Sequence, residues 1–134
     1  MAVDTDTIEH LKHLFRPLGH VSTRRMFSGA GLYADGVIFA LLIGEGSALH
    51  FKVDDETRPA FAAEGSGPFV YETKHGPKTV DSYWRSPADP FDDPDACLEF
   101  ARLAFAAARR KAAVEARKPK AKAKTKTKKR GSVR

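Results

Sequence analysis

The last 18 residues of the chain constrain its fold most, because they cannot join a folded core. Residues 117–134 contain ten basic side chains, no acidic or aromatic one, and a single valine among lysine, alanine and threonine. This composition buries too little apolar surface to offset the conformational entropy that folding removes. We therefore expect residues 117–134 to be a disordered, lysine-rich tail and residues 1–116 to form the folded domain.

The charge of the chain is divided in the same way. The whole chain has a formal net charge of +6, but the tail alone carries +10, so residues 1–116, with 13 basic and 17 acidic side chains, carry −4. Basic side chains in a flexible segment release counterions when they contact phosphates, which gives salt-sensitive binding without sequence preference. We expect nine tail residues to contact DNA or RNA: Arg117, Lys118, Lys120, Lys122, Lys124, Lys126, Lys128, Lys129 and Arg130. The alternative is an incidental tail that serves only solubility.

Length and cysteine content favour one soluble, cytoplasmic domain. The folded part is long enough to bury a core without a disulfide or a metal. Its single cysteine, Cys97, cannot form an internal disulfide, and the polar residues 1–9 lack the apolar segment of a secretory leader. The longest apolar run, residues 37–43, is much shorter than the roughly 20 residues of a membrane-spanning helix. We therefore expect no contact with a membrane.

Three helices are expected from apolar spacing and capping residues. Near the start, apolar residues recur at helical intervals, Asp6 and Glu9 have the spacing of a capping box, and Pro17 and Gly19 favour an end to the helix. Thr57 is the expected cap of a short helix. Before the tail, an apolar stripe that includes Cys97 predicts a long helix, with Asp93 as its cap and Pro94 in its first turn.

Six strand patterns lie between these helices. Four come before Thr57, with a tight turn at Asp35 and Gly36, and two more flank residues 75–77. The connections are too short for the crossovers of parallel strands. The element order α-β-β-β-β-α-β-β-α therefore predicts an α+β fold of two layers, an antiparallel β-sheet with helices packed on it.

No residue pattern predicts catalysis, a metal or a cofactor. Gly29 and Gly31 precede strand residues rather than a helix, so we interpret them as a hairpin bend or bulge and not as a phosphate loop. His10 and His13 share a helix face without further zinc ligands. Cys97 lies on an apolar stripe, where a thiol usually packs as a small hydrophobe. The acidic residues 89–95 lack the glycine and glutamate of a calcium loop, and helix capping explains them.

Two pairs of adjacent strand residues are candidates for a partner surface. Tyr83 and Trp84 must point to opposite faces of a sheet, so one belongs to the core and the other can face a partner. Arg24 and Arg25 divide in the same way. We expect a protein partner at this surface, with packing beneath a loop or helix as the alternative.

The order of several short motifs resembles the TfoX N-terminal domain family. The resemblance spans about residues 8–110. The motifs are Arg24-Arg25-Met26-Phe27, Gly29-Ala30-Gly31-Leu32-Tyr33, Asp35-Gly36, Phe51-Lys52-Val53-Asp54, Thr57-Arg58, Pro68-Phe69 and Tyr83-Trp84. The resemblance implies an α+β domain with no catalytic residues to carry over. Full-length members also carry a C-terminal domain and regulate DNA-uptake genes with a DNA-binding activator; here the lysine-rich tail takes that position. Ser28 stands where the family commonly has glycine.

Three hypotheses follow for function. The first is a bacterial regulatory domain, competence regulator-like, that engages a protein partner while the tail holds it on DNA. The second is a protein-binding adaptor or chaperone-like module with an incidental tail. The third, ranked last because no nucleophile and base are paired in the sequence, is a small enzyme that uses Cys97, His50 or the acidic loop.

Overall fold

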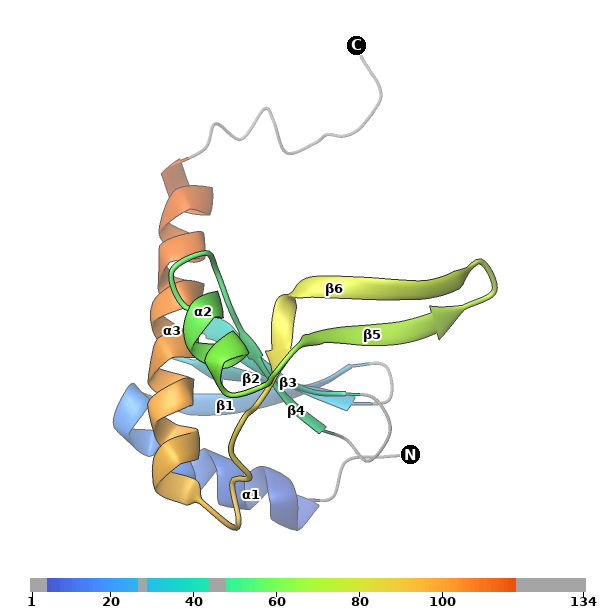
Figure 1. Ribbon diagram of the computed structural model, residues 1–134. Coiled ribbons are helices and arrows are strands. Elements are labelled where there is room, and N and C mark those ends of the chain that lie inside the picture. The colour runs from blue at the N-terminus through green and yellow to red at the C-terminus, as the bar shows by residue number, and fades with distance from the viewer. Residues whose placement is uncertain (1–4, 27–28, 44–47, 118–134) are drawn as a thin grey trace.

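Three helices and six strands form in the order that the sequence predicts. A computed structural model describes residues 5–26, 29–43 and 48–117 (Figure 1). The helices are α1 (Thr5–Leu14), α2 (Arg58–Ala63) and α3 (Pro94–Arg117), with a short 3-10 turn η1 (Arg16–Leu18) after α1. The strands are β1 (Val21–Met26), β2 (Gly29–Ala34), β3 (Val37–Ile43), β4 (Ala48–Lys52), β5 (Pro68–Thr73) and β6 (Gly76–Arg85). The predicted α+β class is therefore confirmed.

The strands form one antiparallel sheet in the spatial order β1-β2-β3-β4-β6-β5. Tight turns join β2 to β3 and β5 to β6, whereas α2 carries the chain from β4 to the outer strand β5. The turn at Asp35 and Gly36 has positive φ at both residues, 49° and 83°, as an Asp-Gly hairpin turn requires. The β5–β6 hairpin projects away from the helices (Figure 1).

The core lies between the sheet and the helices and combines large rings with small helix residues. Phe15, Phe39, Phe51 and Phe61 are fully buried and meet edge to face, with ring centroids 5.5 to 6.3 Å apart. Opposite them, α3 presents its smallest side chains: Cys97, Ala101, Ala104 and Ala108. Small residues on the helix let it approach the sheet closely enough to enclose the phenylalanine rings without voids. All three helices bury their side chains in this one core.

Two capping predictions have different outcomes. The Asp93 carboxylate accepts the backbone N–H of Ala96 and so caps α3, and the Asp89 carboxylate accepts two backbone N–H groups of the preceding loop. Thr57 is the N-cap residue of α2, as predicted, but its side chain makes no cap hydrogen bond. Instead, Asp54 accepts the Thr57 N–H at 3.1 Å, and the Thr57 hydroxyl accepts the Asp54 N–H at 3.0 Å.

Glycines 29 and 31 lie inside β2 and not in a bend. A Cβ on Gly29 would run into the backbone carbonyl oxygen of Leu42 on β3, so only glycine permits this approach of the two strands. The expected structural role is therefore correct for Gly29, but its reason is a close contact between strands. Ser28 lies outside the described residues.

Candidate binding face of the sheet

One face of the sheet is left without a helix over the described residues. The helices all pack on the face that carries Phe51 and Trp84. Because strand side chains alternate between faces, the residues next to these two lie on the other face. We call this the uncovered face. Its principal side chains are Arg24, Tyr33, Leu41, His50, Lys52, Phe69, Tyr71, Tyr83 and Arg85.

The uncovered face is basic, although the folded domain as a whole is acidic. The described strands contain only two acidic residues, Glu72 and Asp81. Glu72 alternates with Tyr71 and points to the opposite side of the hairpin. Asp81 forms an ion pair with Arg58 of α2, at 3.6 Å, which directs it toward the helices. No carboxylate of the described strands therefore faces the cations of this face, although Asp54 and Glu115 lie near Lys52 at its edge.

Two cations of this face lie over aromatic rings. The Arg24 guanidinium lies over the Tyr33 ring, 5.7 Å from its centroid, and the Lys52 ammonium lies over the Tyr83 ring at 5.0 Å. Such contacts hold a cation by the negative face of the ring without neutralising its charge. Arg24 is exposed and can therefore still attract an anion, whereas Lys52 is buried near Asp54 and Glu115.

Burial shifts the pKa of Lys52 and that of Tyr83 in the directions that favour the neutral side chains. Lys52 is 8% exposed, and burial, followed by the charge of Lys111, lowers its pKa. Burial, with a smaller contribution from Tyr33, raises the pKa of Tyr83 to about 12. The Tyr83 phenol is therefore neutral at physiological pH.

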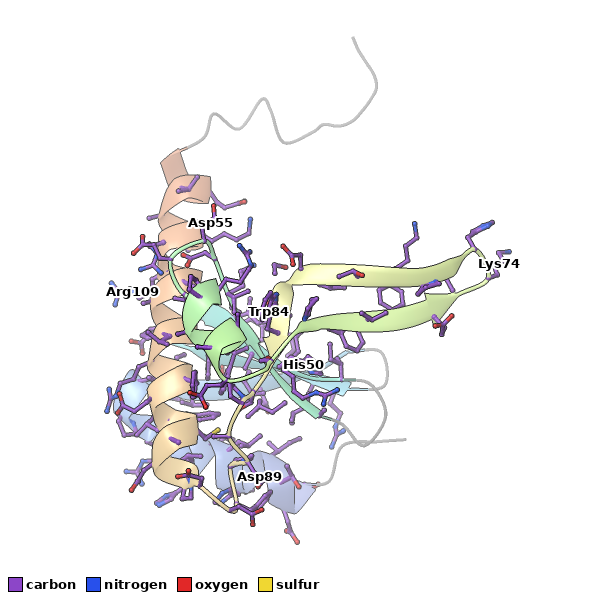
Figure 2. The ribbon with its side chains drawn as sticks, in the orientation of Figure 1. His50, Asp55, Lys74, Trp84, Asp89 and Arg109 are labelled. Carbon is purple, nitrogen blue, oxygen red and sulfur yellow. The ribbon has the colours of Figure 1, made fainter. Side chains whose placement is uncertain are left out.

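A hollow of about 480 Å³ is lined by residues of β3 to β6, among them His50. Figure 2 labels His50 near the point where the β5–β6 hairpin leaves the sheet. His50 is 4% exposed, its Nδ1 lies 3.0 Å from the Ala48 carbonyl oxygen, and burial lowers its pKa. Its ring meets Phe69 edge to face at 5.0 Å, and Phe69 stacks beside Tyr71 at 5.8 Å with an interplanar angle of 18°. Arg85 lies at the same hollow and is exposed. The hollow thus combines a flat aromatic wall with a cation.

The four residues of the predicted partner surface divide between the two faces. Arg24 and Tyr83 lie on the uncovered face. Trp84 packs against the core, and Arg25 is opposite the buried Ala30, on the face that the helices cover. The pairs thus separate as strand alternation predicts, and the structure adds which member belongs to which face.

Most residues of the predicted nucleic-acid-binding tail lie outside the described residues. Arg117 is the last residue of α3. The eight that lie outside the described residues are Lys118, Lys120, Lys122, Lys124, Lys126, Lys128, Lys129 and Arg130.

Cys97 and the histidines of α1 have structural surroundings. Cys97 is fully buried, its Sγ lies 3.8 Å from the Ser86 hydroxyl, and burial raises its pKa to about 11. A neutral, inaccessible thiol is a poor nucleophile. His10 stacks on Phe91 at 4.3 Å, with its Nε2 2.9 Å from the Pro90 carbonyl oxygen. Within the described ranges, no three His, Cys, Asp or Glu residues gather as metal ligands would.

Sequence reasoning missed the hollow and its aromatic wall. Phe69, Tyr71 and Arg85 occupy positions that a strand pattern alone leaves ambiguous, because alternation says which residues share a face but not which face a helix covers. The sequence does indicate that His50 and Lys52 share one face of a strand, since they alternate with Leu49 and Phe51. Only the strand order shows that this face continues onto β6 and β5.

Comparison with known proteins identifies the domain. The family model described as the TfoX N-terminal domain matches residues 13–108, which cover β1 to β6 and most of α3. No curated protein matches the chain. None of the helices that the structure describes is long and apolar enough to cross a membrane. Because the match covers well over half of its residues, the chain belongs to the TfoX N-terminal domain family.

Proposed function

We propose that this chain is a non-catalytic regulatory domain that engages a macromolecular partner through its uncovered face, while its lysine-rich tail holds it on nucleic acid. The observation that carries the proposal is the uncovered face itself, which gathers aromatic rings and cations in a domain of opposite net charge. An exposed surface of this composition is unusual unless it meets a partner. A role like that of the family's competence regulators belongs to the same proposal.

The surroundings of the reactive side chains support a non-catalytic role. Catalysis by Cys97 needs a thiolate, and burial favours the neutral thiol. His50 is the only histidine at the hollow, and no carboxylate of the described residues pairs with it to orient it as a base. If the chain were an enzyme that uses the thiol, a Cys97→Ala variant would lose activity.

The tail supplies the second half of the proposed function. Truncation after Arg117 removes nine of the ten tail cations and no described contact. We expect the truncated protein to fold as before and to lose its retention on duplex DNA at low ionic strength. Electrophoretic mobility shifts at 20 mM and 200 mM salt measure this, since binding through many phosphate contacts weakens steeply with salt. Equal duplex binding by the truncated protein would remove the tail from the proposal.

A protein-binding adaptor is the second candidate, and the outer strand β5 favours it. Val70 and Tyr71 on this edge strand are 50% and 46% exposed, and an exposed edge can accept a strand from another protein. Recovery of one partner with both full-length and truncated protein, unaffected by nuclease, would favour the adaptor.

A further inference from the structure

We propose that the uncovered face is a stacking platform for single-stranded nucleic acid, with Phe69 and Tyr71 as the base-binding rings. This inference rests on the proposed function, because it names the partner class of the same face. It also assigns the domain a task that the tail cannot perform, since the tail has cations but no aromatic ring.

The aromatic wall has the geometry that stacking needs. Phe69 and Tyr71 lie two residues apart on an edge strand, with nearly parallel rings at 5.8 Å. Tyr71 is 46% exposed, so a flat base can cover its ring. Every base has a π-face, so stacking on such rings tolerates any sequence.

Cations are placed beside the rings for the phosphates. Lys78 is paired directly with Tyr71 across the hairpin, and Arg85 lies at the hollow beside Phe69. Lys78 and Arg85 are exposed, and neither forms an ion pair with another described residue. Both acidic side chains of the strands point elsewhere, and the hollow beside Phe69, Tyr71 and Arg85 is lined by no carboxylate of the described residues.

The exposed rings favour a nucleic acid over an acidic peptide, and a single strand over a duplex. An acidic peptide is attracted by the cations alone and does not need two parallel rings at the surface. In a duplex the bases stack on one another, and only the phosphates reach the protein without base flipping. A stacking platform therefore predicts a preference for single strands that the tail alone would not give.

The test compares four probes on the full-length chain and its variants. Fluorescein-labelled (dT)20, the oligo(rU) of the same length and a 20-base-pair duplex are titrated at fixed salt, with a labelled decaglutamate peptide as the acidic-peptide probe. Tyr71→Ala should weaken binding of the single strands by at least about fivefold and leave duplex binding unchanged. Tyr71→Phe keeps the ring and should bind like the parent. Phe91→Ala removes an aromatic side chain that is 57% exposed on another part of the molecule and serves as the matched control.

Each outcome decides between the proposals. Single-strand binding that is unchanged in Tyr71→Ala, or equally weakened in Phe91→Ala, overturns the stacking platform. If Tyr71→Ala and Arg85→Ala weaken decaglutamate but not (dT)20, the face binds an acidic peptide; the stacking inference then fails and the proposed binding face stands. If no face variant changes the binding of any probe, both fail. A difference between (dT)20 and oligo(rU) that disappears in Tyr71→Ala supports the platform and names the preferred strand.

Discussion

The carboxylate of Asp54 connects the turn before α2 to α3. Its removal should destabilise the domain more than removal of its ionic partner, Arg110. Arg110 of α3 donates two hydrogen bonds to it, from Nε at 2.7 Å and from a terminal nitrogen at 3.1 Å. The same carboxylate accepts the backbone N–H groups of Glu56 and Thr57, both at 3.1 Å. Asp54 thus serves one ion pair and one helix start.

The magnitudes follow from the exposure of the pair. The Arg110 and Asp54 side chains are 39% and 30% exposed, so water screens their attraction to about 0.2–1 kcal/mol. Loss of a capping carboxylate costs about 1 kcal/mol more. Asp54→Ala should therefore lower the free energy of unfolding by about 1–2 kcal/mol, and Arg110→Ala by no more than about 1 kcal/mol.

Urea unfolding of both single variants and the double variant measures the two contributions separately. The double-mutant cycle should give a coupling energy of about 0.5–1 kcal/mol, with unchanged m values. The control is the more exposed ion pair of Lys111 and Glu115, 3.1 Å apart on one face of α3. Its coupling energy should be at most about 0.5 kcal/mol. If Arg110→Ala costs as much as Asp54→Ala, the capping role of the carboxylate is wrong.

The same carboxylate predicts a dependence on pH. The hydrogen bond from Arg110 is the main reason that the pKa of Asp54 is lowered in the folded protein. A group whose pKa is lower folded than unfolded stabilises the protein above its unfolded pKa, near 4, and this stabilisation disappears as the pH falls through the folded pKa. The stability difference between the parent and Asp54→Asn should therefore be constant from pH 7 to pH 5 and shrink below pH 4.

Three further experiments test the packing. Gly29→Ala should lower the free energy of unfolding in urea by about 1–3 kcal/mol, because its methyl group meets the Leu42 carbonyl oxygen. Gly67→Ala is the control: no atom lies within 4 Å of the new methyl group, so the free energy of unfolding should change by less than about 0.5 kcal/mol. Phe51→Ala should cost about 3–5 kcal/mol, since the ring is fully buried and touches Phe15 and Phe61; a cost below 1 kcal/mol would contradict the described core. Cys97 should react with a thiol reagent at pH 8 only at the rate of unfolding, because it is buried and its pKa is about 11; rapid labelling of the native protein would place it at the surface.

Local sequence signals predict most of the fold. The Asp35-Gly36 turn, the Asp93 cap and the alternation around Phe51 each specify structure within a few residues, so the order of elements can be read in sequence. The role of Asp54 is harder to predict. Its hydrogen bonds to Glu56 and Thr57 are local, but its ionic partner Arg110 is 56 residues away.

The binding face is harder to predict because it depends on long-range strand order. His50 and Arg85 become neighbours only because β6 inserts between β4 and β5. Alternation separates Tyr83 from Trp84, but the helices decide which of the two is covered. The sequence therefore predicted members of the face, Arg24 and Tyr83, without the surface that unites them.

The central claim is that the uncovered face is the binding surface of the domain, and amide chemical shifts test it most directly. A ¹⁵N-labelled protein truncated after Arg117 is titrated with unlabelled (dT)20 and followed residue by residue. The claim predicts shifts concentrated at His50, Phe69, Tyr71, Tyr83 and Arg85, with none on α1. Shifts confined to the outer surfaces of α1 and α3, or no shift at any strand residue, would contradict it.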